Sequence, residues 1–87
     1  MTGPPPDEPP PGEPVVVDAR GLICPRPVIE AARASRALPP GTVLEVWATD
    51  PAAALDLPAW CRMRGHELVE VREREGDVPL RVVVRLR

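Results

Sequence analysis

Residues 80–86 alternate between apolar and mainly basic side chains. Leu80, Val82, Val84 and Leu86 share one face, and Arg81, Val83 and Arg85 share the other. Successive side chains of a strand point to opposite faces, so this period of two predicts a strand with one buried face. The chain is therefore expected to form a sheet that is covered by helices on one side and faces solvent on the other.

Upstream of this strand, strand and helix patterns alternate. The sequence predicts strands at 15–18, 42–49 and 67–73, and helices at 25–37 and from 56 to about 64. Gly65 is expected to end the second helix, and the last two strands should form a hairpin around Gly76 and Asp77. The order strand, helix, strand, helix, strand, strand predicts a two-layer α/β sandwich with segregated layers, which is an α+β arrangement.

Proline divides the chain into two parts. Residues 1–14 contain seven of the fourteen prolines and no apolar residue larger than proline after Met1. Such a segment cannot bury enough surface to offset ordering, so we expect a disordered tail at 1–14 and one domain at 15–87. The N-terminus lacks a signal-peptide pattern and no apolar run reaches membrane-span length, which favours a soluble protein of the reducing cytoplasm.

Charge and residue usage exclude several classes of function. From Val15 onward the chain has eleven arginines and ten acidic residues, so its net charge is close to zero. Trp47 and Trp60 are the only aromatic residues, and both observations disfavour direct nucleic-acid binding. Lysine is absent, which excludes Schiff-base catalysis through a lysine amine. Cys24, Cys61 and the single histidine lack the close pairing of zinc ligands, so no metal site is expected.

Cys24 is the strongest candidate for chemistry. It lies between a predicted strand and a predicted helix, where an N-cap position and the helix dipole would favour the thiolate. Pro25 and Pro27 lack N–H groups, so the Arg26 amide is expected to face the sulfur. The Arg20 and Arg26 side chains are expected to add positive charge.

Other polar and sulfur-bearing residues have simpler interpretations. Cys61, inside the second predicted helix, is expected to belong to the core. Asp50 is expected to start a turn, and Asp56 to cap the second helix. His66 follows Gly65 at a helix-to-strand junction, where a histidine is more often a hydrogen-bonded structural residue than a catalyst.

The motif around Cys24 resembles a known family signature. Its residues are Asp18-Ala19-Arg20-Gly21-Leu22-Ile23-Cys24-Pro25-Arg26-Pro27-Val28. This string is similar to the signature of the TusA-like (SirA-like) sulfur-carrier family, and segments 48–51, 56–61 and 65–68 extend the similarity across 15–87. The resemblance implies a four-stranded mixed sheet with two helices on one face and a persulfide carried on Cys24, without a dissociable cofactor.

Roles are also assigned to residues around Cys24 and to four others. Arg20, Gly21, Pro25, Arg26 and Pro27 are assigned as auxiliary to Cys24. The remaining candidates are assigned to partner contacts or to structure, and they are Asp18, Asp50, Asp56 and His66.

A sulfurtransferase role follows from the resemblance. A cysteine desulfurase or a rhodanese-type donor would load Cys24, and the sulfur would pass to a downstream acceptor thiol. Family routes lead to tRNA thiolation, molybdenum-cofactor assembly or oxidation of inorganic sulfur, and the sequence does not choose among them. Two alternatives stay open: a non-catalytic binding module, for which Trp47 on the solvent face is a candidate anchor, and a thiol redox sensor that uses Cys24 and Cys61.

Overall fold

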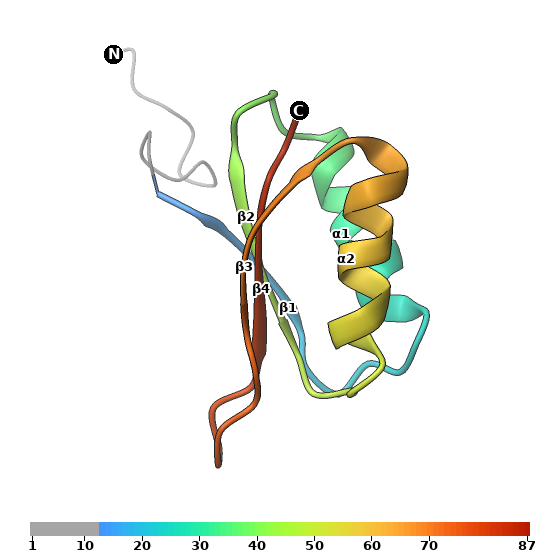
Figure 1. The fold of residues 1–87 in the computed structure, drawn as a ribbon, viewed down its shortest axis with the longest axis vertical. Helices are drawn as coiled ribbons and strands as arrows, with labels where there is room; N and C mark the ends of the chain where they lie inside the picture. Colours follow the sequence, from blue (N-terminus) through green and yellow to red (C-terminus); the bar gives the residue numbers. More distant parts are fainter. Residues whose placement is uncertain (1–12) are drawn as a thin grey trace, which may run out of the picture.

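Two helices cover one face of a four-stranded sheet, as a computed structural model that describes residues 13–87 shows (Figure 1). The elements in chain order are β1 (Val15–Ala19), α1 (Arg26–Arg36), β2 (Val43–Ala48), α2 (Ala53–Arg64), β3 (Glu67–Arg72) and β4 (Leu80–Arg85). The sheet order is β1-β2-β4-β3; β1 and β2 are parallel, and the other neighbours are antiparallel. The predicted two-layer βαβαββ sandwich with a mixed sheet is confirmed.

Alternation along β2 and β4 forms the sheet side of the core. Register places Val46 opposite Val82 and Leu44 opposite Val84, and all four are fully buried beneath the helices. The intervening residues face away from the helices and stay partly accessible. Thirteen apolar residues make up the core: Ala19, Ala31, Leu44, Val46, Ala48, Ala53, Leu57, Trp60, Cys61, Leu80, Val82, Val84 and Leu86. The predicted one-sided burial of the sheet is confirmed.

The second helix begins earlier than the sequence pattern indicated. Asp50 opens it: its Oδ1 accepts the Ala52 N–H at 3.0 Å and its carbonyl accepts the Ala53 N–H at 3.0 Å. The prediction that Asp56 caps this helix is therefore wrong, because Asp56 lies in the first turn and Pro58 lies inside the helix. Gly65 ends α2 in a left-handed conformation with φ 74°, as predicted.

The parallel pairing of β1 and β2 brings two loops together. Ala19 at the end of β1 lies opposite Ala48 at the end of β2, so the loops that follow leave the same edge of the sheet. Both helices begin at this edge and run in the same direction (Figure 1). One end of the domain thus carries the two connecting loops and both helix N-termini, and the other end carries both helix C-termini.

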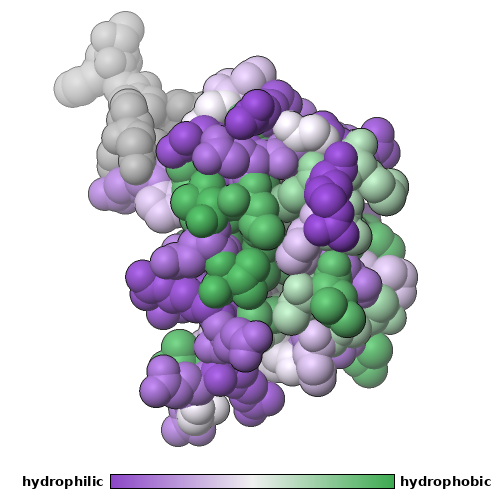
Figure 2. Space-filling view, viewed as in Figure 1, coloured by the Kyte–Doolittle hydropathy of each residue, from purple (hydrophilic) through white to green (hydrophobic). Residues whose placement is uncertain are grey.

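Strand β3 forms one edge of the sheet and is poorly covered. Its residues Leu68, Val69 and Val71 are exposed, and Figure 2 shows apolar surface along this part of the molecule. A register shift between Leu68 and Glu70 interrupts its pairing with β4. No helix within residues 13–87 is long and apolar enough to cross a membrane. The predicted disorder of residues 1–14 falls almost wholly outside the described residues.

Two leucines of α2 provide a test of this packing. Leu57 is fully buried and Leu55 is 76% exposed. We predict that Leu57→Ala lowers the free energy of unfolding by about 2–5 kcal/mol, because it leaves a cavity in the core. The same truncation at Leu55 should change it by less than about 0.5 kcal/mol. Urea unfolding followed by circular dichroism measures both, and equal losses would contradict the assignment of the core.

Candidate functional site

The loop between β1 and α1 is held against the end of β2. Gly21 adopts φ 80°, a conformation that favours glycine, and its N–H donates to Thr49 Oγ1 at 2.9 Å. The Leu22 N–H donates to the Ala19 carbonyl at 3.2 Å, which closes a turn directly after β1. These contacts fix the path of the chain just before Cys24.

Two carboxylates from the second loop and helix contact Cys24. Its backbone N–H donates to Asp50 Oδ2 at 2.7 Å, and its Sγ–H donates to Asp56 Oδ2 at 2.7 Å. Asp50 follows β2, and Asp56 lies in the first turn of α2. The side chain of Cys24 is exposed, whereas both aspartates are partly buried. The site is therefore an accessible thiol with two carboxylates, those of Asp50 and Asp56, on one side of it.

These carboxylates set the protonation state of the sulfur. The hydrogen bond to Asp56 raises the pKa of the Cys24 thiol, and desolvation and the negative charges of Asp56 and Asp50 raise it further. The N–H groups of Cys24 and Ala52 lower the pKa of Asp50, which keeps that carboxylate ionised. The prediction of a thiolate favoured at rest is wrong, since the nearby carboxylates favour the neutral thiol.

The helix terminus also differs from the expected arrangement. Pro25, not Cys24, is the N-cap of α1, and the Cys24–Pro25 peptide bond is cis. The Arg26 amide donates to the Ile23 carbonyl at 2.9 Å and not to the sulfur, so its predicted role is wrong. Pro27, in the first turn of α1, is buried, whereas Pro25 is exposed. The prolines shape the start of α1, and the thiol finds its partner on α2.

Arg20 is engaged elsewhere. Its Nε and a terminal nitrogen donate to the two oxygens of Asp18 at 2.8 and 2.7 Å, and its guanidinium carbon lies 5.2 Å from the centroid of the Trp47 ring. The hydrogen bonds between the two side chains lower the pKa of Asp18 to about 2 and raise the pKa of Arg20. Asp18 and Trp47 are register partners on the open face of the sheet. Arg20 therefore fixes the end of β1 through Asp18 and Trp47. Nothing supports the prediction that its positive charge stabilises the Cys24 thiolate.

Comparisons with known proteins place this geometry in a family. The family described as "Sulfurtransferase TusA" matches residues 15–85. The sulfur carrier protein TusA of Pseudomonas aeruginosa is 48% identical over 61 residues, which covers 70% of this chain and 77% of that protein. The sulfur carrier protein TusA of Pseudomonas fluorescens is 47% identical over 60 residues, with 69% and 72% covered.

The chain belongs to the TusA family. The matched region of this TusA-family protein spans the two helices and four strands found in residues 13–87, and it includes Cys24 and the two aspartates that contact it. The family resemblance noted from the motif is thereby confirmed.

His66 and Cys61 have structural positions in the TusA-family domain. His66 Nδ1 accepts the Arg87 N–H at 3.1 Å, and its ring lies 5.0 Å from that of Trp60. This hydrogen bond agrees with the structural interpretation of His66, which lies beyond the C-terminal end of α2, whereas Asp56 lies near its beginning. Cys61 is 1% exposed and is not bonded to Cys24, so its assignment to the core is confirmed. Within residues 13–87, no group of three histidine, cysteine or acidic side chains is placed to hold a metal ion.

Sequence reasoning missed the partner of the thiol. Asp50 and Asp56 were candidates for partner contacts or structure, and Thr49 was not singled out. A usable signal existed: parallel strands end at the same sheet edge, so residues just after the second strand should meet the loop after the first. The direct contact between Sγ and Asp56 additionally depends on where α2 begins, which the Asp56-Leu57-Pro58 pattern misplaced.

The carboxylate of Asp56 should slow the alkylation of Cys24. Asp56→Asn should make Cys24 react several-fold faster with iodoacetamide at neutral pH, because removing the negative charge favours the reactive thiolate. Asp77→Asn, which removes one carboxylate from the β3–β4 turn, serves as the charge-matched control and should leave the rate unchanged. Mass spectrometry of the modified protein gives the rate at Cys24. An unchanged or slower rate in Asp56→Asn would contradict the assigned effect of this carboxylate.

Proposed function

We propose that this protein is a sulfur carrier that holds sulfane sulfur as a persulfide on Cys24. The observation that carries the proposal is an exposed cysteine that forms no disulfide. It lies on a loop that is hydrogen-bonded to Thr49, and a carboxylate oxygen lies 2.7 Å from its sulfur. Membership in the sulfurtransferase family supports the same role, as do the relatives named sulfur carriers. A cysteine desulfurase or a rhodanese-type protein would supply the sulfur, and an acceptor protein thiol would take it.

Loading is an exchange without net oxidation or reduction. Cys24 loses its proton and its sulfur attacks the outer sulfur of the donor persulfide. A new bond forms between Cys24 Sγ and that outer sulfur, while the bond to the donor's cysteine breaks. The donor cysteine leaves as a thiolate and takes up the proton. Unloading repeats these steps with the acceptor thiolate as the attacking group and Cys24 as the leaving group.

Asp56 is placed to exchange a proton with Cys24 during loading and during unloading. Its Oδ2 already accepts the Cys24 Sγ–H, so it lies where a proton acceptor is needed. A carboxylate is ordinarily a much weaker base than a thiolate, so the thiol predominates until a donor is present. Such a resting thiol is protected from indiscriminate reaction with oxidants and small electrophiles. Reactivity would then depend on the docked partner.

A redox-sensor role for the two cysteines gains no support from their positions. A sensor pair needs two thiols that can approach each other closely. Cys61 is buried among core residues, whereas Cys24 is exposed in a loop. The sulfur-carrier proposal requires only Cys24.

Sulfur loading can be measured directly. After incubation with a cysteine desulfurase and cysteine, intact-mass spectrometry should show the addition of one or more sulfur atoms on Cys24. Cys24→Ser should gain none, because it lacks the nucleophile, whereas Cys61→Ala should load like the wild type. A rhodanese charged with thiosulfate provides the second donor. If Cys24 gains no sulfur from either donor while the protein remains folded, the proposal fails.

A further inference from the structure

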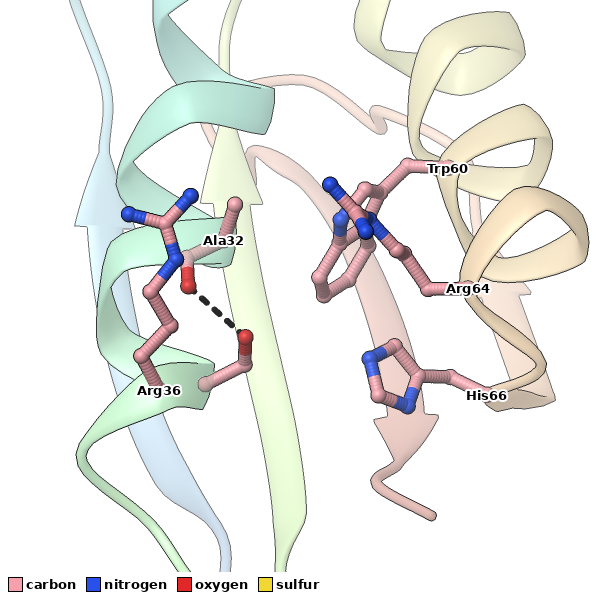
Figure 3. A pocket seen from close by; sticks show the side chains of 6 residues that line it. Ala32, Arg36, Trp60, Arg64 and His66 are labelled. Carbon is pink, nitrogen blue, oxygen red and sulfur yellow. Dashed lines mark hydrogen bonds between the residues drawn. The ribbon is translucent and has the colours of Figure 1, made fainter.

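A cavity lies at the end of the domain opposite to Cys24. Its volume is about 350 Å³, and its lining comes from the C-terminal halves of both helices and from the residue after Gly65. The lining residues are Ala32, Ser35, Arg36, Trp60, Arg64 and His66. Figure 3 shows the side chains of α1 on one side of this cavity and those of α2 and His66 on the other. Nothing in the proposed sulfur chemistry uses it.

The charge of this cavity is one-sided. Arg36 and Arg64 both line it, and no carboxylate does. Neither arginine pairs with a carboxylate of residues 13–87. Most other arginines do have such a partner there, namely Arg20, Arg33, Arg72, Arg81, Arg85 and Arg87. The cavity therefore has one arginine on each side and no counter-charge in its lining, an arrangement that favours an oxyanion as ligand.

Interaction with the helix dipole does not account for the presence of both arginines in the lining of this cavity. Basic residues in the last turn stabilise the negative end of a helix wherever they lie around its circumference. Arg33 and Arg62 also occupy the last turns of α1 and α2, and neither lines the cavity. The dipole therefore explains a preference for arginine near these helix ends, but it does not require Arg36 and Arg64 to line the same cavity.

Two ring systems add hydrogen-bond donors and a flat apolar surface. His66 Nδ1 accepts the Arg87 N–H, so the neutral ring carries its proton on Nε2, and Figure 3 shows a ring nitrogen directed into the cavity. Trp60 is only 6% exposed, yet its indole N–H has no hydrogen-bond acceptor among the described residues. This N–H is not among the fully buried atoms without a partner, and Figure 3 shows it directed into the cavity, where it is open to an incoming acceptor.

We propose that this cavity binds a small organic oxyanion, a phosphate or carboxylate group attached to a planar ring. Arg36 and Arg64 hold the oxyanion, with the His66 Nε2–H as a further donor, and the ring packs against Trp60. The volume is near the lower end of the range of ligand sites, roughly 300–1,000 Å³, so it suits a compact molecule. The site does not depend on sulfur transfer at Cys24 and would persist if that function were disproved.

The two tryptophans allow a test with an internal control. Phenyl phosphate is titrated into the ¹⁵N-labelled protein, and the indole N–H signals are followed by NMR. The Trp60 signal should shift and saturate. The Trp47 signal should not, because Trp47 lies on the opposite face of the sheet. Inorganic phosphate lacks the ring and should bind more weakly, and phenol lacks the oxyanion and should not saturate. Absence of saturation at Trp60 up to about 10 mM phenyl phosphate would overturn the proposal.

Matched arginine variants locate the oxyanion. Arg36→Gln and Arg64→Gln should each weaken binding tenfold or more, because each removes a charge-assisted hydrogen bond. Arg74→Gln removes the same charge at an exposed position outside the cavity and should not change the affinity. If Arg74→Gln weakens binding as much as the other two, the attraction is only nonspecific, and the proposal is wrong. Equal affinities for phenyl phosphate and inorganic phosphate would overturn the role of the ring.

Discussion

The hydrogen bond from Cys24 Sγ to Asp56 Oδ2 is the contact on which the chemistry of this protein depends. It ties the loop after β1 to the first turn of α2, and it places a negative charge beside the sulfur. The neighbouring bond from the Cys24 N–H to Asp50 makes the attachment twofold. A single pair of acidic residues thus fixes both the position of the thiol and its protonation state.

The fold makes this contact possible through the parallel pair β1 and β2. Their common direction brings two loops to one edge of the sheet, although Cys24 and Asp56 are 32 residues apart. Both helices begin there, so the thiol lies near two helix N-termini whose dipoles oppose the effect of the carboxylates. The net effect raises the pKa of Cys24, because a hydrogen-bonded charge at 2.7 Å acts more strongly than partial charges of a helix end.

Sequence patterns were sufficient for the architecture. The period of two in residues 80–86 predicted the one-sided sheet, and Gly65 correctly marked the end of α2, because both signals reflect local geometry. The start of α2 was misplaced because an Asp-Leu-Pro triplet imitates a helix N-terminus, while the actual N-cap is Ala52, whose N–H donates to Asp50.

The site was predicted in its central residue and not in its electrostatics. Cys24 stood out because of the prolines around it, and its exposure agrees with a reactive role. Local sequence suggested positive neighbours, Arg20 and Arg26, whereas the groups that raise its pKa are carboxylates from a distant segment. The charge around a residue depends on tertiary contacts, which spacing along the chain does not specify.

The most direct test of this account is the pKa of Cys24 itself. An NMR titration of the ¹³Cβ resonance of Cys24 in the wild-type protein follows the thiol without any reagent that could disturb it. The account predicts a midpoint above the ordinary thiol value of about 8.5, because Asp56 and Asp50 disfavour the thiolate. A midpoint at or below that value would contradict the claim that the carboxylates hold Cys24 as a protonated thiol.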